Sequence, residues 1–133
     1  MIKASVEIKN NSSVLLKNIK ETELLVEEAT EVMAKRMRDS LTSGAKSGRQ
    51  YYIDGARHTS SAPGQAPASV TGALVRSIKT VTKKGIGNIF IKKNYAIYLE
   101  YGTTKMRPRP FILPAFLYTK QWIMNKLKNK VIK

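Results

Sequence analysis

The chain has 133 residues, 42% of them hydrophobic, which suits one domain, expected to span residues 1–133, with a core of its own. It holds no cysteine, which excludes disulfides, cysteine nucleophiles and cysteine-rich zinc sites and fits assembly in a reducing cytoplasm. Its formal net charge of +15 favours an anionic partner, a nucleic acid or an acidic protein surface, unless the lysines only solvate the surface.

The first 44 residues predict a strand followed by a long helix. Residues 2–9 alternate loosely between apolar and polar side chains, as a short strand does. Ser12 or Ser13 can cap the helix expected over residues 14–42, and Gly44 ends it. Acids lie in the first half of this helix and bases near its end, an order that complements the helix dipole. Its apolar side recurs at steps of three and four residues and comprises Leu15, Ile19, Thr22, Val26, Ala29, Met33 and Met37.

Residues 43–70 are predicted to form a long loop. Glycine, proline and small polar residues dominate this segment, and neither a strand period nor a helix period persists in it. A loop of this length inside one domain is usually functional or disordered. Tyr51 and Tyr52 argue against simple disorder, because aromatic side chains need a surface to lie on.

The next segment predicts a short helix and a β-hairpin. Residues 71–78 fit a short helix that Thr71 caps, with leucine, valine and isoleucine on its apolar side. Two short strands follow over residues 79–84 and 88–93. Gly85-Ile86-Gly87 joins these strands, so they are expected to form a hairpin.

The last third predicts a second long helix. Residues 95–101 fit either a short helix or a short strand, and residues 102–110 form a loop. Residues 111–129 form the helix, with Pro114 in its first turn. Its apolar side comprises Ala115, Phe116, Leu127 and either Trp122 or Ile123. Together the elements predict an α+β fold: a small sheet with a β-hairpin, packed against N-terminal and C-terminal long helices, with a long central loop.

The chain offers no recognisable catalytic set. His58 is the one histidine, and it stands in the glycine- and serine-rich segment, where side chains usually face solvent. Asp54 and Glu100 are the only acids after residue 39, and nothing in the sequence places them together for acid–base work. Metal ligands at a recognisable spacing are absent from the sequence. The chain is therefore expected to be no enzyme and to use no cofactor or metal, and neither a signal peptide nor a membrane span is expected.

Charge is unevenly distributed along the chain. Seven of the nine acids lie in the first 39 residues, and the residues after Glu100 include eight bases and no acid. Lys83, Lys84, Lys92 and Lys93 lie at the ends of the expected hairpin, where a basic β-ribbon can contact DNA phosphates or an acidic partner. This pattern supports an alternative function as a basic nucleic-acid-binding module of a phage or mobile element.

Three ordered motifs give the chain a family resemblance. They are Ser61-Ala62-Pro63-Gly64-Gln65-Ala66-Pro67, then Thr71-Gly72-Ala73-Leu74-Val75-Arg76-Ser77-Ile78, then Tyr95-Ala96 with Leu99-Glu100-Tyr101-Gly102-Thr103 and Arg109-Pro110-Phe111-Ile112-Leu113-Pro114-Ala115. In this order and spacing, over about residues 14–125, the chain resembles the head–tail joining proteins of long-tailed bacteriophages and prophages. These proteins are also described as neck, tail-completion or tail-component proteins.

The resemblance implies a structural role. Proteins of this family form part of the neck, where a DNA-filled head meets a preassembled tail. The chain is then expected to be a virion protein that assembles in the host cytoplasm as a ring-forming subunit, six to a ring. Its implied partners are itself and the neighbouring neck and tail proteins, with possible non-specific contact to the genomic DNA in the channel. The resemblance also implies a small α+β domain with helices packed on one side of a sheet.

The arginine-proline segment suits a subunit interface. Pro108 and Pro110 restrict the backbone around Arg107 and Arg109, and a segment ordered in advance loses little entropy on docking. Arginine is also a common anchor of protein interfaces. We expect either arginine to pair with an acid of a neighbouring subunit, with Glu100 as a candidate partner. The alternative is that both arginines are simply solvated.

The long segment at residues 43–70 fits the same role. Tyr51 and Tyr52 are expected to contact a neighbouring subunit, and Pro63 and Pro67 stiffen the chain that reaches it. Such a segment can be mobile in the free protein and become ordered only on assembly.

Overall fold

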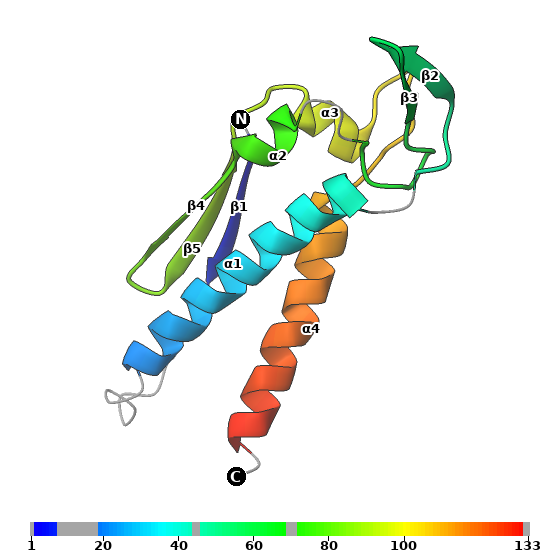
Figure 1. Cartoon of the computed structure of the whole chain (residues 1–133). Helices are drawn as coiled ribbons and strands as arrows, with labels where there is room; N and C mark the ends of the chain where they lie inside the picture. The colour runs from blue at the N-terminus through cyan, green and yellow to red at the C-terminus, as the bar shows by residue number, and fades with distance from the viewer. Residues whose placement is uncertain (1, 8–18, 44–45, 69–71, 132–133) are drawn as a thin grey trace.

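The computed structural model describes residues 2–7, 19–43, 46–68 and 72–131 of the chain (Figure 1). Its elements are, in order, β1 (Ile2–Glu7), α1 (Ile19–Ser43), β2 (Gln50–Ile53), β3 (Ala56–Thr59), α2 (Ala73–Ser77), β4 (Ile78–Lys83), β5 (Ile86–Ile91), α3 (Ala96–Tyr101) and α4 (Ile112–Val131). Five predictions lie outside the described residues: strand residues 8–9, the cap by Ser12 or Ser13, helix residues 14–18, the stop at Gly44 and the cap by Thr71.

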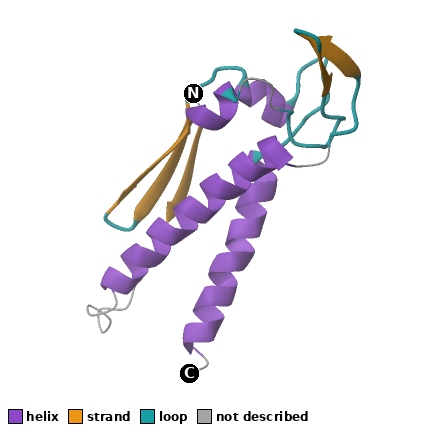
Figure 2. Cartoon of the chain, viewed as in Figure 1, coloured by secondary structure: helices purple, strands orange, loops and turns teal. Residues whose placement is uncertain are grey.

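The main sheet is antiparallel and has the strand order β1-β5-β4, so β5 is its central strand (Figure 2). Ile91 at the end of β5 lies opposite Ile2 of β1 and opposite Ile78 of β4. Along β5, Ile89 and Ile91 are buried, whereas Phe90 between them is only half-buried. The strands therefore bury one face of the sheet and leave the other partly open, as their alternating sequence requires.

The turn between β4 and β5 lies one position earlier than the sequence predicted. Lys83 pairs with Ile86, which leaves Lys84 and Gly85 as a two-residue turn with φ angles of 50° and 80°. Positive φ at both turn positions is the type I′ geometry, which matches the twist of the flanking strands. The expected Gly85-Ile86-Gly87 connection is wrong, because Ile86 and Gly87 belong to β5.

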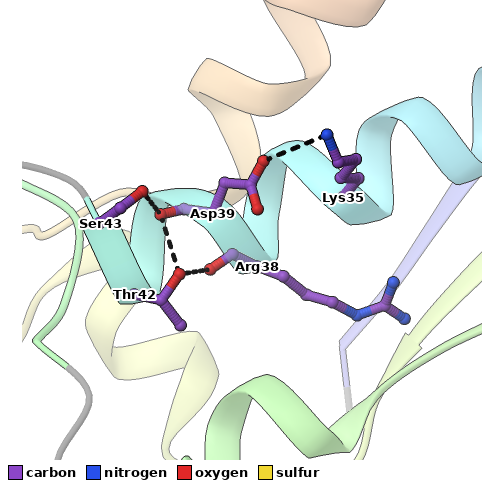
Figure 3. Close-up of polar contacts among 5 residues, drawn as sticks. All are labelled: Lys35, Arg38, Asp39, Thr42 and Ser43. Atoms are coloured by element: carbon purple, nitrogen blue, oxygen red, sulfur yellow. Dashed lines mark hydrogen bonds and ion pairs between the residues drawn. The ribbon is translucent and has the colours of Figure 1, made fainter.

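The short helix α2 leads directly into β4. Ile78 was expected on the apolar side of this helix, but it is the first residue of β4 and is buried there. Its carbonyl oxygen accepts a hydrogen bond of 2.8 Å from the Arg38 guanidinium, and Figure 3 shows this side chain extending away from the other polar groups of α1. Arg38 thereby ties α1 to the junction of α2 and β4.

Helix α1 lies across one face of the sheet and also contacts α4 (Figure 1). This arrangement confirms the predicted α+β fold, with a small sheet that contains a hairpin packed against two long helices. On α1 the predicted residues Val26, Ala29, Met33 and Met37 are buried, whereas Ile19 is exposed. The buried cluster comprises Val6, Ala29, Met33, Ala34, Met37, Leu41, Leu74, Ile78, Ile89, Ile91, Ala96, Phe111 and Ala115.

Helix α1 lies close to the sheet at Gly87. A Cβ atom built on Gly87 would lie 1.7 Å from the Thr30 hydroxyl oxygen and 3.0 Å from its Cβ. The Thr30 side chain is buried, and its hydroxyl donates a 2.7 Å hydrogen bond to the Val26 carbonyl within α1. Only glycine leaves room for this helix to lie so close to the central strand.

The apolar side of α4 differs in part from the prediction. Ala115 is buried, and both Trp122 and Ile123 pack against the core. Phe116 and Leu127 were expected inside but are 45% and 40% exposed. The apolar residues of α4 span a wide arc, and contact with α1 covers only part of it.

The segment at residues 43–70 contains a hairpin where the sequence predicted only a loop. β2 and β3 pair in antiparallel register, with Ile53 opposite Ala56. Asp54 and Gly55 form the turn between them, with φ angles of 49° and 80°. Asp-Gly is a strong signal for a type I′ turn, and the polar composition of the segment masked it. We call residues 50–59 the arm, because they pair with each other and make few contacts with other elements (Figure 1).

Replacing Gly87 by alanine is expected to lower the free energy of unfolding by about 1–3 kcal/mol, because the added methyl group overlaps the Thr30 side chain. The cost should be smaller when Thr30 is also alanine, since the nearest overlapping atom is then absent. Urea denaturation of the wild type, both single variants and the double variant measures this coupling. Equal costs of Gly87→Ala in the two backgrounds would contradict the close approach.

Candidate interface site between α3 and α4

Glu100, near the end of α3, caps the start of α4. One carboxylate oxygen, Oε2, accepts hydrogen bonds from the backbone N–H groups of Phe111 and Ile112, and Oε1 accepts one from Leu113, all at 2.9 Å. Glu100 is buried, with 9% of its surface exposed. The first N–H groups of a helix have no partner within the helix, so this carboxylate supplies acceptors that the helix itself lacks.

Pro114 completes this cap. It is the third residue of α4 and has no backbone N–H, so it adds no unpaired donor to the helix start. The two oxygens of Glu100 therefore serve the three donors that precede it. Because both oxygens are engaged within the chain, we assign Glu100 to the fold rather than to the arginine pairing that the sequence suggested.

Residues 102–110 turn sharply at Gly102. Gly102 has a φ of 78°, in the left-handed region that favours glycine. A Cβ atom there would lie 2.8 Å from the Met106 carbonyl oxygen and 2.9 Å from Pro108, so no side chain fits. The loop closes through a 2.8 Å hydrogen bond from the Thr103 N–H to Met106, and returns to α3 through one of 2.7 Å from the Arg109 N–H to Leu99.

The two arginines of this loop lie in different environments. Arg107 is exposed, as an interface residue would be in the free subunit. Arg109 is half-buried, and its Nε is buried without a hydrogen-bond partner among the described residues. The Arg109 side chain therefore packs partly within the fold, and Arg107 is the freer of the two for contact with another molecule.

The Ser61–Pro67 motif packs against the same loop. The Gly64 N–H donates a 3.0 Å hydrogen bond to the Pro108 carbonyl. The Gln65 side chain holds the motif in shape, because its Oε1 accepts hydrogen bonds of 2.9 Å from the N–H groups of Ser47 and Ala62. Pro63 is exposed and Pro67 is buried, so only Pro63 is available to a neighbouring molecule.

Lys46 fastens this motif to the end of α1. Its ammonium group donates hydrogen bonds of 2.9 Å to the Ser40 carbonyl and 2.6 Å to the Ala66 carbonyl. Partial burial lowers the pKa of Lys46 below its ordinary value of 10.5. The link also satisfies one of the carbonyl groups that the end of a helix leaves unpaired.

A hollow of about 350 Å³ lies where these segments meet. Its walls come from the second half of α1, the Ser61–Pro67 motif and the start of α4, and comprise Arg36, Asp39, Ser40, Ser43, Gly64, Ala66, Pro110, Phe111, Pro114 and Ala115. Figure 3 shows two of the α1 residues that line it, Asp39, which pairs with Lys35 at 3.8 Å, and Ser43, whose hydroxyl donates to the Asp39 carbonyl at 2.8 Å. The polar groups of this wall are thus largely engaged with one another.

The exposed aromatic residues of α3 were not predicted as a surface. Tyr95, Ile97, Tyr98 and Tyr101 are all exposed, and 74% of the Tyr101 surface is open to solvent. The apolar run at residues 95–101 was ambiguous in the sequence, because it fits a helix and a strand equally well. These exposed tyrosines precede the loop that carries the exposed Arg107, and both residue types are common at protein interfaces.

The two tyrosines of the arm differ in exposure. Tyr52 is 73% exposed, and Tyr51 is half-buried with its ring 5.9 Å from that of His58 across the hairpin. Both tyrosines were expected to contact a neighbouring subunit. Tyr52 is exposed enough to do so, whereas Tyr51 packs within the arm.

The four lysines predicted to contact an anionic partner do not form one cluster. Lys83 and Lys84 are exposed at the β4–β5 turn, whereas Lys92 and Lys93 follow β5 at the opposite end of the hairpin. A strand of six residues spans roughly 20 Å, so one compact ligand cannot contact both pairs. Lys93 is also half-buried, which leaves the other three as the exposed lysines of this set.

Searches for metal ligands, membrane-spanning helices and similar proteins identify no further feature in the described residues. Within the described residues, no group of three or more histidine, cysteine, aspartate or glutamate side chains could hold a metal ion. No helix in the described part of the chain is both long enough and apolar enough to cross a membrane. No family model, no curated protein and no solved structure matches the chain.

Replacing Glu100 by alanine is expected to lower the free energy of unfolding by about 2–4 kcal/mol, because three N–H groups at the start of α4 lose their acceptor. Glu100→Gln keeps one acceptor oxygen and should fall between the alanine variant and the wild type. Denaturant unfolding measures the stabilities, and hydrogen exchange at residues 111–113 reports the cap directly. The neighbouring Tyr101→Ala is the control, expected within about 0.5 kcal/mol of wild type. An unchanged Glu100→Ala variant would refute the capping role.

Proposed function

We propose that this chain is a structural virion protein of a tailed bacteriophage, a ring-forming neck or tail-completion subunit that joins the DNA-filled head to the tail. The proposed role is assembly and not catalysis. The proposed partners are further copies of the chain and the neighbouring neck and tail proteins, in a virion that assembles in the host cytoplasm.

The observation that carries this proposal is the meeting of two motifs far apart in the sequence. The Gly64 N–H of the first motif bonds to the Pro108 carbonyl beside the third motif. Within the third motif, Glu100 caps the helix that starts after Phe111. The residues that carry the resemblance to head–tail joining proteins therefore have defined structural roles, which supports a shared fold over a chance match of short motifs.

The arm and the α3 surface support an assembly role as well. Both present large aromatic side chains to solvent, Tyr52 on the arm and Tyr98 and Tyr101 on α3. Tyrosines exposed in a free subunit are suited to burial at an interface, because they supply contact area at low entropic cost. A subunit that contacts several neighbours at once requires more than one such surface.

A second candidate function, a basic nucleic-acid-binding module, is supported by the open face of the sheet. Phe90 of the central strand lies between Lys3 and Lys79 in the register, and the Lys3 ammonium lies 5.8 Å from the Phe90 ring. An aromatic ring flanked by lysines can contact a single strand of nucleic acid. A DNA-binding titration at two salt concentrations separates the candidates: tight, salt-sensitive binding by the monomer favours this module, and weak binding favours the ring subunit.

Deletion of the gene from its phage tests the proposed function. We expect DNA-filled heads and separate, complete tails in lysates, visible by negative-stain electron microscopy, because the joining step fails when a neck subunit is missing. Complementation with the intact gene serves as the control and should restore joined particles. Normal infectious particles from the deletion phage would refute a role in head–tail joining.

Two substitutions should separate assembly from folding. Arg107→Ala removes an exposed charge, so it should change the free energy of unfolding by less than about 0.5 kcal/mol but reduce complementation of the deletion phage. Phe111→Ala removes a ring that is 1% exposed and should destabilise the monomer by about 3–5 kcal/mol. Thermal unfolding and plaque counts provide the two measurements. Full complementation by Arg107→Ala would remove this arginine from the interface.

A further inference from the structure

The outer face of α1 carries a group of acids around one exposed leucine. Leu24, Glu27, Glu28 and Glu31 follow one another at helical spacing, and all four are exposed. Leu24 is 59% exposed and supplies an apolar side chain among these charged residues. Glu31 accepts a hydrogen bond from the Thr80 hydroxyl, which leaves its charge in place. We call these four residues the acidic face.

A basic and aromatic surface lies on α3 and the loop that follows it. It consists of Tyr98, Tyr101, Lys105 and Arg107, all of them exposed, and we call it the basic end. Glu100 is the only acid between residues 95 and 111, and its carboxylate is buried in the cap of α4. The positive charge of this end is therefore not balanced by a neighbouring acid in the sequence.

The two surfaces lie at opposite ends of the subunit. Figure 1 shows the first half of α1, in blue, at the lower left, whereas α3 and the loop after it lie at the top. Within one chain, the segments that carry the acidic face and the basic end consequently do not lie side by side. Between two copies, the acidic face of one can meet the basic end of the other.

We propose that the acidic face of one copy binds the basic end of the next copy, with Leu24 and Tyr101 in the centre of the contact and the charges at its rim. This pairing specifies a contact within the proposed ring and rests on that proposed function. Its anatomy is that of ordinary interfaces, an apolar centre with complementary charges around it. Because the two surfaces differ, the contact is heterologous and repeats from copy to copy, which produces a closed ring or an open array.

The chain contains no cysteine, so the contact can be tested by disulfide trapping without background. In a Leu24→Cys/Tyr101→Cys variant, mild oxidation with diamide should link successive copies into a ladder of dimers, trimers and higher species on non-reducing gels. The matched control is Leu24→Cys/Met124→Cys, which also carries two exposed cysteines but has one of them on α4. We expect at least tenfold more linked product from the first variant than from the control.

Charge reversal in the same background tests the electrostatic part. Glu27→Lys/Glu28→Lys makes both surfaces basic and Lys105→Glu/Arg107→Glu makes both acidic, so each set alone should reduce trapping at least tenfold. An equal mixture of the two should restore it, because each contact between one variant and the other joins opposite charges. Lys120→Glu/Lys128→Glu, an equal reversal at exposed sites on α4, should leave trapping unchanged. Trapping of the unreversed variant should also fall between about 0.05 M and 0.5 M salt.

The outcomes separate this contact from the function on which it rests. Trapping no greater than in the Met124 control, or charge-reversed variants that trap as well as the parent, overturns the proposed contact. If trapping fails but the deletion phage still gives unjoined heads and tails, the neck function is supported. The contact between copies must then involve other surfaces.

Discussion

The fold of the second half of the chain depends on one buried carboxylate. Glu100 is the last acid in the sequence, and it is placed where the start of α4 needs an acceptor. A buried carboxylate is costly unless its oxygens are hydrogen-bonded, and helix N–H groups are costly unless they have acceptors, so each group offsets the desolvation of the other. The pairing sets the end of α3 against the start of α4. The loop between them must then turn at Gly102, which presents Arg107 to solvent.

Periodicity was sufficient to predict the main elements and the fold class. The spacing of Val26, Ala29, Met33 and Met37 predicted both α1 and its buried side. Alternation predicted β1, and two short runs joined by a glycine-containing turn predicted the hairpin of β4 and β5. The hairpin of β2 and β3 was not predicted, although its turn has a local sequence signal. Asp54-Gly55 is a hairpin signal in the sequence, but a segment rich in glycine and serine made a loop the simpler interpretation.

The role of Glu100 could not be obtained in this way, because its partners lie 11 to 13 residues away and are backbone groups, which no side-chain pattern encodes. The exposed side of α4 was missed for a related reason. Phe116 and Ala115 are adjacent in a wide apolar arc, and the sequence does not state which part of such an arc meets α1. Contacts between residues far apart in the sequence decide which of the two is buried. The sequence therefore indicated candidate interface residues but not the contacts that each of them makes in the fold.

Backbone hydrogen bonds join the two chain segments at the root of the arm. At its root, the Gly48 N–H bonds to the Ser60 carbonyl at 2.7 Å, and the Ser60 N–H bonds to the Arg49 carbonyl at 3.0 Å, so the two chain ends enter and leave the arm side by side. Residues beyond this root make few contacts with other elements. Insertions and deletions there would change loop-closure entropy only slightly and leave the core as it is. The reach of the arm can therefore evolve in steps of residue pairs, independently of the domain that carries it.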